Sequence, residues 1–218
     1  MMFERVYCVN VERRADRWES FVRGLPEDWP FKPVERFDAV DGSRVMPPAW
    51  WLRGCAGAWG CYRSHLRLIE GCLSEGVQSV LIFEDDAVFR EDFTERWQQY
   101  IEKVPNTWEL LYLGGQHLKL RRQKPEKINE QVNVPYNVNR THAYAVQGSG
   151  IQKLYSHLND VQNWMGLDHF DHHIGRLIQR KAIETYCPNE WLVGQSNIVS
   201  DITGRRNRAE VTWFKGVR

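Results

Sequence analysis

Three adjacent carboxylates, Glu84, Asp85 and Asp86, follow directly after the apolar run 80–83. This run predicts a central strand covered on both faces, and ligands of open α/β sheets gather beyond the carboxyl ends of such strands. Three like charges at a strand end repel one another unless a divalent cation, with the phosphates it carries, shares the site. The pattern therefore indicates a metal–diphosphate site; a solvated acidic turn that caps the next helix is the alternative.

Within this triplet, Asp86 is the first candidate for a direct metal ligand. Glu84 lies two positions earlier and so on the same side of an extended chain, whereas Asp85 would point elsewhere, towards a ribose or a neighbouring amide. Oxygen ligands and phosphates suit Mg²⁺ or Mn²⁺ better than zinc, and no Cys/His set in the sequence has the spacing expected of a zinc site.

A basic and polar group stands at the end of the first predicted strand and the opening of the first predicted helix. Asn10, Arg13 and Arg17 belong to it, and in α/β proteins this place faces a nucleotide and its phosphates. They are therefore candidates for contacts with a bound nucleotide. The alternative is an exposed helical face on which Asp16 pairs with a neighbouring arginine, and this is the favoured interpretation for Arg14.

Strand and helix signals alternate along the chain, which predicts one α/β domain over residues 1–218. Strands are expected at 6–11, 34–40, 80–83, 109–113 and 141–146, and helices at 16–25, 58–74, 91–104 and 149–158. The polar, lysine- and arginine-rich stretch 114–139 is longer than loops inside compact domains usually are. It is predicted to be a flexible functional flap, with a solvated excursion as the alternative.

Composition limits the classes of function. The 218 residues are 42% hydrophobic, enough for one domain with a substantial core. A net charge of +1 gives no overall electrostatic case for nucleic acid, a membrane surface or a polyanionic partner. The five cysteines are an odd set without CxxC spacing, which favours reduced, buried thiols. No apolar stretch has the length of a signal peptide or a membrane span, so a cytoplasmic protein is expected.

Three motifs stand in order along the chain: Val-Asn-Val-Glu-Arg-Arg-Ala-Asp-Arg at 9–17, Gly-Cys-Tyr-Arg-Ser-His at 60–65 and Phe-Glu-Asp-Asp-Ala at 83–87. In their order and spacing the chain resembles glycosyltransferase family 25, whose members are often lipooligosaccharide biosynthesis proteins. Shorter fragments extend the resemblance over almost the whole chain, at 111–115, 141–145, 167–170 and 200–202. Departures are Val11, where the family usually has leucine, and the tryptophan-rich segment 50–59; they bear on acceptor choice more than on fold.

The resemblance implies a GT-A-like domain, in which a Rossmann-like nucleotide half joins an acceptor half around a mixed central sheet flanked by helices. It also implies a sugar-nucleotide donor and Mn²⁺ or Mg²⁺. Cleavage of a sugar–diphosphate bond puts negative charge on the leaving nucleoside diphosphate, which a cation held by carboxylates stabilises. The expected metal ligands are Glu84 and Asp86, with His172 the best placed histidine for a third.

Further donor contacts follow from the family pattern. Ser64 and His65 would hydrogen-bond the donor from a helix beside the acidic strand; for His65 the alternative is a buried ring packed on apolar neighbours. Gln195 and Ser196 belong to a C-terminal segment that in such enzymes closes over the donor. The arginines after it either grip phosphate or form a solvated basic end.

The acceptor side is predicted around the stretch 166–174. An attacking sugar hydroxyl must lose its proton as the new bond forms, and a nearby carboxylate can accept it. Asp168 matches the family's acidic position and shares a helix face with His172 at i,i+4, so it is the candidate general base. Asp171 is the substitute, and a helix N-cap is the alternative role for either.

The sequence thus predicts a metal-dependent transferase that moves a hexose, with galactose as the first expectation, from a UDP-sugar to a hydroxyl of a glycan such as lipopolysaccharide. A lipid-linked acceptor would bring this cytoplasmic protein to the inner membrane. Two alternatives from other classes stay open: a nucleotidyltransferase, which would release pyrophosphate, and a non-catalytic module that binds sugar nucleotide or glycan.

Overall fold

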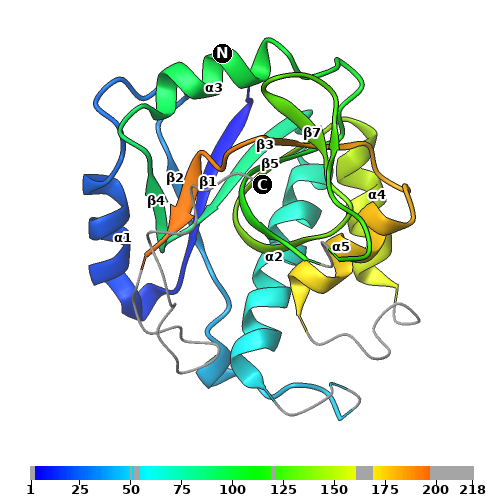
Figure 1. Ribbon diagram of the computed structural model, residues 1–218. Coiled ribbons are helices and arrows are strands. Elements are labelled where there is room, and N and C mark those ends of the chain that lie inside the picture. Colours follow the sequence, from blue (N-terminus) through cyan, green and yellow to red (C-terminus); the bar gives the residue numbers. More distant parts are fainter. Residues whose placement is uncertain (1–2, 50, 52–54, 119–120, 161–168, 197–218) are drawn as a thin grey trace.

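An eight-stranded sheet forms the middle of the molecule (Figure 1). The structure, a computed structural model, describes residues 3–49, 51, 55–118, 121–160 and 169–196. The strands run in the order β2-β1-β3-β8-β5-β9-β7-β6, and β10 and β4 form a separate antiparallel pair. Their bounds are β1 Arg5–Asn10, β2 Glu35–Asp38, β3 Ser79–Glu84, β4 Ala87–Phe89, β5 Leu110–His117, β6 Glu126–Lys127, β7 Val132–Val134, β8 Val138–Gln147, β9 Thr185–Pro188 and β10 Val193–Gln195.

The sheet is mixed. β1 lies between β2 and β3 and is parallel to both, whereas β3 and β5 each pair antiparallel with β8. The carboxyl ends of β1 and β3 therefore meet at one edge of the sheet, as expected for a ligand site in an α/β fold. The predicted α/β class with a mixed, helix-flanked sheet is confirmed.

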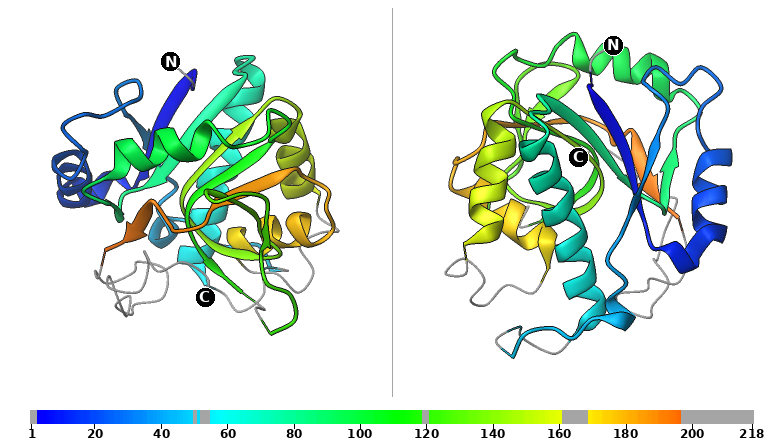
Figure 2. Two further views of the ribbon diagram at one scale, coloured as in Figure 1. Left: turned by 45° about the horizontal axis from the view of Figure 1, so that its top comes forward. Right: turned by 180° about the vertical axis from the view of Figure 1, so that it is seen from behind.

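Strand β3 is buried on both faces because its side chains alternate between two cores. Val80 and Ile82 belong to the core under α2, α4 and α5, and Leu81 and Phe83 to the core under α1 and α3; all four are 0% exposed. Figure 2 shows these helices on the two faces of the sheet. Full burial of such a side chain stabilises the fold by about 1.5–3 kcal/mol. The prediction of a central strand covered on both sides is confirmed.

The helices cover the two faces of the sheet: α1 Ala15–Arg23, α2 Ala56–Ser74, α3 Phe93–Ile101, α4 Ser149–Asn159 and α5 Phe170–Gln179, with short 3₁₀ turns η1 Glu12–Arg14 and η2 Gly42–Arg44. The long helix α2 packs against both α4 and α5 (Figure 1). Its buried side chains include Leu66, Ile69 and Cys72, three residues apart, which gives it one continuous apolar stripe. Among the described helices, none has the length and apolarity needed to cross a bilayer.

The stretch 114–139 was predicted to be one flexible flap, but its described part contains several strands. β5 continues through Gly114 to His117, β6 and β7 lie inside the stretch, and β8 begins at Val138, so much of its described part is sheet. The pairing of β5 with β8 continues through register shifts on either side of Gly114. A Cβ on Gly114 would lie 2.3 Å from the Val193 carbonyl oxygen, so the glycine permits a close approach of β10 rather than ending the strand.

Candidate functional site

The acidic triplet opens onto a cavity of about 590 Å³ at the carboxyl ends of β1 and β3. β3 ends at Glu84, and Asp85 and Asp86 form the turn that leads into β4. All three carboxylates line the cavity, together with side chains from η1, α1, α2, β8, α5 and β10. The predicted position of the acids at a strand end is therefore confirmed.

Asp85 points towards a neighbouring amide, that of Asn10, as predicted, but the contacts of the acids do not set Glu84 and Asp86 together; their predicted roles as metal ligands stay predictions. Because the strand ends at Glu84, the next two residues follow the geometry of a turn. Arg17 Nη2 lies 2.5 Å from Asp85 Oδ1 and 3.4 Å from Asp86 Oδ2, so these two carboxylates share one guanidinium. Glu84 instead accepts a hydrogen bond from the Thr141 hydroxyl at 2.7 Å and lies 3.3 Å from His65 Nε2.

The pKa values of the two turn carboxylates, Asp85 and Asp86, are raised, so their ionised forms are disfavoured in the folded protein. Burial raises the pKa of Asp85 to about 6, although Arg17 and the Asn10 amide act to lower it. Burial, followed by the neighbouring charge of Glu84, raises the pKa of Asp86 to about 7 in spite of Arg17. A cation placed beside them would offset both causes.

Asp86 also has an unused acceptor. Its Oδ2 accepts a hydrogen bond from Gln195 Nε2 at 2.8 Å, whereas its buried Oδ1 has no hydrogen-bond partner among the described residues. A buried carboxylate oxygen without a donor, on a residue that lines the cavity, is a suitable ligand atom for Mg²⁺ or Mn²⁺. The residues at the turn therefore fit a hard divalent cation, as the family resemblance expects.

The pKa of Glu84, in contrast to those of Asp85 and Asp86, is lowered. Burial acts to raise its pKa, but the His65 ring and the Thr141 hydroxyl outweigh this and hold the pKa at about 2. It is therefore a carboxylate already supplied with partners, from α2 on one side and β8 on the other.

Asn10 supports the acidic turn from β1. Its side chain is 1% exposed, and Nδ2 donates to Asp85 Oδ2 at 2.5 Å and to the Arg14 carbonyl at 3.0 Å. Its Oδ1 accepts a hydrogen bond from Arg36 Nε at 2.9 Å. Both the nitrogen and the oxygen of the Asn10 amide are therefore hydrogen-bonded, and Asn10 positions Asp85. The predicted contact of Asn10 with the donor stays a prediction.

The arginines after Asn10 divide into two kinds. Arg13 lines the cavity and forms an ion pair with Asp41 at 3.0 Å, which fastens η1 to η2. Arg14 pairs with Asp16 at 3.0 Å on the surface, as its exposed-face interpretation expects. Arg13 and Arg17 therefore bring positive charge to the cavity from the first helical turns, and Arg140 adds to it from β8.

Helix α2 contributes two buried polar residues to the cavity wall. Ser64 Oγ donates to the Gly60 carbonyl at 2.7 Å and accepts from the Val40 N–H at 2.8 Å, so it joins the 39–42 loop to the helix. The His65 ring is fully buried, stacks on Phe170 with 4.3 Å between centroids, and is held by the Tyr144 hydroxyl 2.9 Å from Nδ1. Both side chains have partners within the protein, and their contacts with the donor stay predictions.

Strand β10 closes one side of the acidic turn. It pairs with β4, and the Ser196 N–H donates to the Asp86 carbonyl oxygen at 2.7 Å. Gln195 bridges Asp86 to the Arg140 guanidinium, whose Nη1 donates to its Oε1 at 3.3 Å. The two residues that the sequence assigned to a closing C-terminal segment thus contact the acidic turn directly.

The predicted acceptor side falls partly outside the described residues, because Asp168 is not among them. Asp171 and His172, in the first turn of α5, line the cavity. Asp171 Oδ2 accepts from the backbone N–H of Arg140, a residue in the left-handed region with φ 77°. His172 lies 4.0 Å from Asp171 Oδ1, and its predicted role as a metal ligand stays a prediction.

Sequence reasoning missed several residues that line or brace the cavity: Asp41, Cys61, Arg140, Thr141 and Tyr144. For Cys61 a signal exists, since it stands four residues before His65 in a predicted helix and so on the same face. The others have no local signal, because their partners lie far away along the chain.

Known proteins with similar sequences include glycosyltransferases and relatives described as inactive. Procollagen galactosyltransferase 1 of Danio rerio is 29% identical over 177 residues, which cover 71% of this chain and 28% of the relative. Inactive glycosyltransferase 25 family member 3 of Homo sapiens is 29% identical over 184 residues, covering 70% of this chain and 28% of the relative. The match with these curated relatives thus spans little more than a quarter of their length.

Among solved structures, a glycosyltransferase involved in the glycosylation of the major capsid of PBCV-1 matches 78% of this chain and 73% of its own, with a TM-score of 0.40 and 9% identity. The model of glycosyltransferase family 25 (LPS biosynthesis protein) matches residues 55–170, more than half of the chain. That stretch contains helix α2 and the complete acidic turn. The chain belongs to glycosyltransferase family 25.

Proposed function

We propose that this chain is a metal-dependent hexosyltransferase that moves galactose from UDP-galactose to a hydroxyl of a glycan acceptor. Several relatives are named procollagen galactosyltransferases, which supports galactose as the sugar that is moved. The family description names LPS biosynthesis, which supports a glycan such as lipopolysaccharide as acceptor. The protein would act in the cytoplasm, where a lipid-linked acceptor would bring it to the inner membrane.

The observation that carries the proposal is the turn of Asp85 and Asp86. Its carboxylates have raised pKa values, one unused buried oxygen and a cavity in front of them. Mn²⁺ or Mg²⁺ held there would neutralise the charge that develops on the departing UDP. The Arg17 guanidinium, which now lies against both acids, is placed to bind a phosphate oxygen once another cation takes over the carboxylates.

The remaining cavity residues have proposed roles on either side of the diphosphate. Arg13, which lines the cavity beside η2, would contact the nucleotide, and Gln195 keeps Asp86 oriented from β10. Asp168 would take the proton of the acceptor hydroxyl as the new bond forms, with Asp171 as the substitute base on α5. With these roles, the donor would lie near β1 and β3 and the acceptor near α5.

A panel of sugar nucleotides with Mn²⁺ tests the proposal, with release of the nucleoside diphosphate as the readout. We expect UDP-galactose to give UDP at the highest rate, and more so with a glycan hydroxyl present. Release of pyrophosphate would instead identify a nucleotidyltransferase. No turnover of any UDP-sugar with any divalent cation would contradict the proposal.

A non-catalytic binding module is the second candidate, because several of the relatives carry the name of an inactive member of the family. Such a module would bind UDP in the presence of Mn²⁺ without turning over any donor. Binding and turnover measured on one preparation therefore separate the two candidates.

A further inference from the structure

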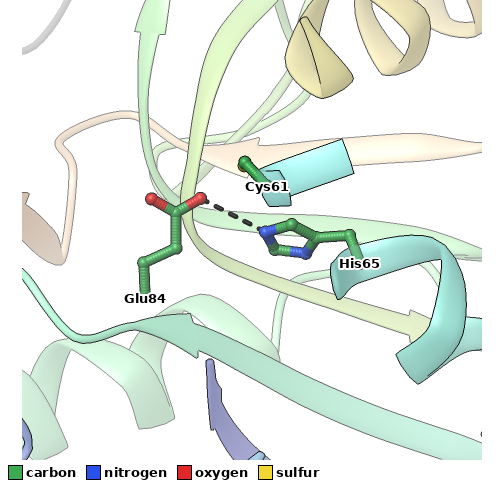
Figure 3. Close-up of side chains that lie close together, drawn as sticks. All are labelled: Cys61, His65 and Glu84. Carbon is green, nitrogen blue, oxygen red and sulfur yellow. Dashed lines mark ion pairs between the residues drawn. The ribbon is translucent and has the colours of Figure 1, made fainter. Parts of the chain in front are cut away.

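Cys61, His65 and Glu84 meet at the wall of the cavity (Figure 3). Cys61 and His65 are one helical turn apart on α2, and Glu84 is the last residue of β3. One possible ligand atom from each, a sulfur, a ring nitrogen and a carboxylate oxygen, lies within 4.8 Å of the other two. A thiol, an imidazole and a carboxylate at these distances need only small side-chain movements to bind one ion.

The His65 ring is held as metal-binding histidines are held. Its Nδ1 lies 2.9 Å from the Tyr144 hydroxyl, and Phe170 stacks against its face. The other nitrogen, Nε2, is buried and lies 3.3 Å from Glu84 Oε1, with which it forms an ion pair when the ring is protonated (Figure 3). An outer partner on one ring nitrogen orients the second towards an ion, which would here lie between Nε2 and Glu84 in place of their direct contact.

Glu84 has an outer partner of the same kind. The Thr141 hydroxyl, on β8, donates to Glu84 Oε1 at 2.7 Å and so fixes the carboxylate towards α2. The two hydroxyls that orient His65 and Glu84 both come from β8, three residues apart. The pair is therefore braced from one strand before any ion arrives.

We propose that Cys61, His65 and Glu84 form a site for a zinc-class divalent cation, with its fourth coordination position open to the cavity. Sulfur and imidazole nitrogen favour Zn²⁺ over Mg²⁺ or Mn²⁺, whereas the oxygen-only pair Asp85 and Asp86 favours the hard cations. The protein thus has two neighbouring cation sites of different chemistry. Sequence spacing does not indicate this site, because the third ligand, Glu84, comes from a strand end rather than from the motif that contains Cys61 and His65.

Cobalt(II), a spectroscopic stand-in for zinc, tests the site without nucleotide or sugar. Titration of the metal-free protein should give a thiolate-to-cobalt charge-transfer band in the near ultraviolet, and Zn²⁺ should remove it by displacement. Cys61→Ser should abolish the band and weaken Zn²⁺ binding at least about a hundredfold, since loss of even an outer partner costs about ten- to a hundredfold. Cys55→Ser, which changes another half-buried cysteine next to α2, is the matched control and should keep the band.

Two further variants separate the sites. Asp86→Asn should retain the cobalt band, because that carboxylate belongs to the hard-cation site, while Glu84→Gln should weaken Zn²⁺ binding. Melting temperatures in EDTA confirm that each variant is folded, and Cys61→Ala replaces Cys61→Ser if the serine variant is not. An equal band in wild type and a folded Cys61 variant, or no band in wild type, would overturn the zinc site. Neither result bears on UDP-sugar turnover, which is measured separately.

Discussion

Asp86 illustrates how a single carboxylate can reduce the stability of the metal-free protein. Its pKa is raised to about 7 in the folded state, against about 3.9 for an unperturbed aspartate. Between these pH values the folded protein binds more protons at this residue than the unfolded chain does. The contribution of Asp86 to the free energy of unfolding therefore falls as the pH rises from about 4 to 7.

Asp86→Asn should accordingly raise the melting temperature in EDTA at pH 7–8, because it removes the buried charge and keeps an acceptor for Gln195. Glu84→Gln is the matched control with the opposite sign. The pKa of Glu84 is held at about 2, so its charge stabilises the fold above about pH 4.5, and that stability is lost as the pH falls towards 2. Melting curves of both variants in EDTA from about pH 2 to 8 check this; equal destabilisation by the two at pH 7–8 would contradict it.

Asp168 and Asp171 can be told apart by paired substitutions. Asp168→Asn should lower the rate of sugar transfer by about 10²–10⁴-fold while leaving Mn²⁺-dependent UDP binding nearly unchanged, as expected for a general base. Asp171→Asn should have the smaller effect on transfer, because Asp171 is bonded to the Arg140 backbone. The transfer rate and UDP affinity of each variant are the measurements. If Asp168→Asn transfers sugar normally and Asp171→Asn loses most of its transfer activity, Asp171 on α5 is the general base instead.

Residues at the site differ in how far the sequence could predict them. Asp86 was predictable, because an apolar strand that ends in acids is a local pattern. The position of Asn10 was predictable too, but its bonds were not, since Asp85 is 75 residues away and Arg36 is 26. The contact between the Tyr144 hydroxyl and His65 joins residues 79 positions apart in the sequence, so it has no local signal either.

Among the elements, helix α2 positions the site through a close contact with the 39–42 loop. A Cβ on Gly60 would lie 2.7 Å from both the Val40 carbonyl oxygen and the Gly42 nitrogen. This contact brings the loop with Asp41, the partner of Arg13, against the helix that carries Ser64 and His65. Glycine is required at position 60 because the loop backbone fills the space a side chain would need.

Gly60→Ala should therefore lower the free energy of unfolding by about 1–3 kcal/mol, as expected of overpacking, and weaken UDP binding. Gly71→Ala is the control on the same helix, where a Cβ meets nothing within 4 Å. It should raise stability by about 0.5–1 kcal/mol through helix propensity and leave UDP binding unchanged. Urea unfolding and UDP titration of the pair check this; a Gly60→Ala protein as stable as Gly71→Ala would contradict the close contact.

The sequence predicted the long elements better than the connections. β3 and α2 could be placed because they carry long apolar patterns, whereas β5 was predicted to end at Leu113 but continues to His117. A pair of glycines usually marks the end of a strand, and here it marks a bulge in β5 that admits β10. β9 and β10 are short, and their pairing partners lie far away in sequence, so the sequence contained no comparable signal for them.

At the scale of the whole molecule, the cavity is complete only when distant parts of the chain meet. Its walls come from β1 and α1, from α2, from the turn after β3, and from β8, α5 and β10. β10 reaches the acidic turn by pairing with β4, across more than a hundred residues of sequence. Nucleotide binding should therefore stabilise the whole fold, since a ligand that binds only the native state shifts the unfolding equilibrium.

Calorimetric titration with UDP tests most directly whether a sugar nucleotide is held through a divalent cation at Asp85 and Asp86. We predict that UDP binds wild type in the presence of Mn²⁺, that binding is lost in EDTA, and that Asp86→Asn shows no difference between the two conditions. UDP binding to wild type with the same affinity in Mn²⁺ and in EDTA would contradict the account.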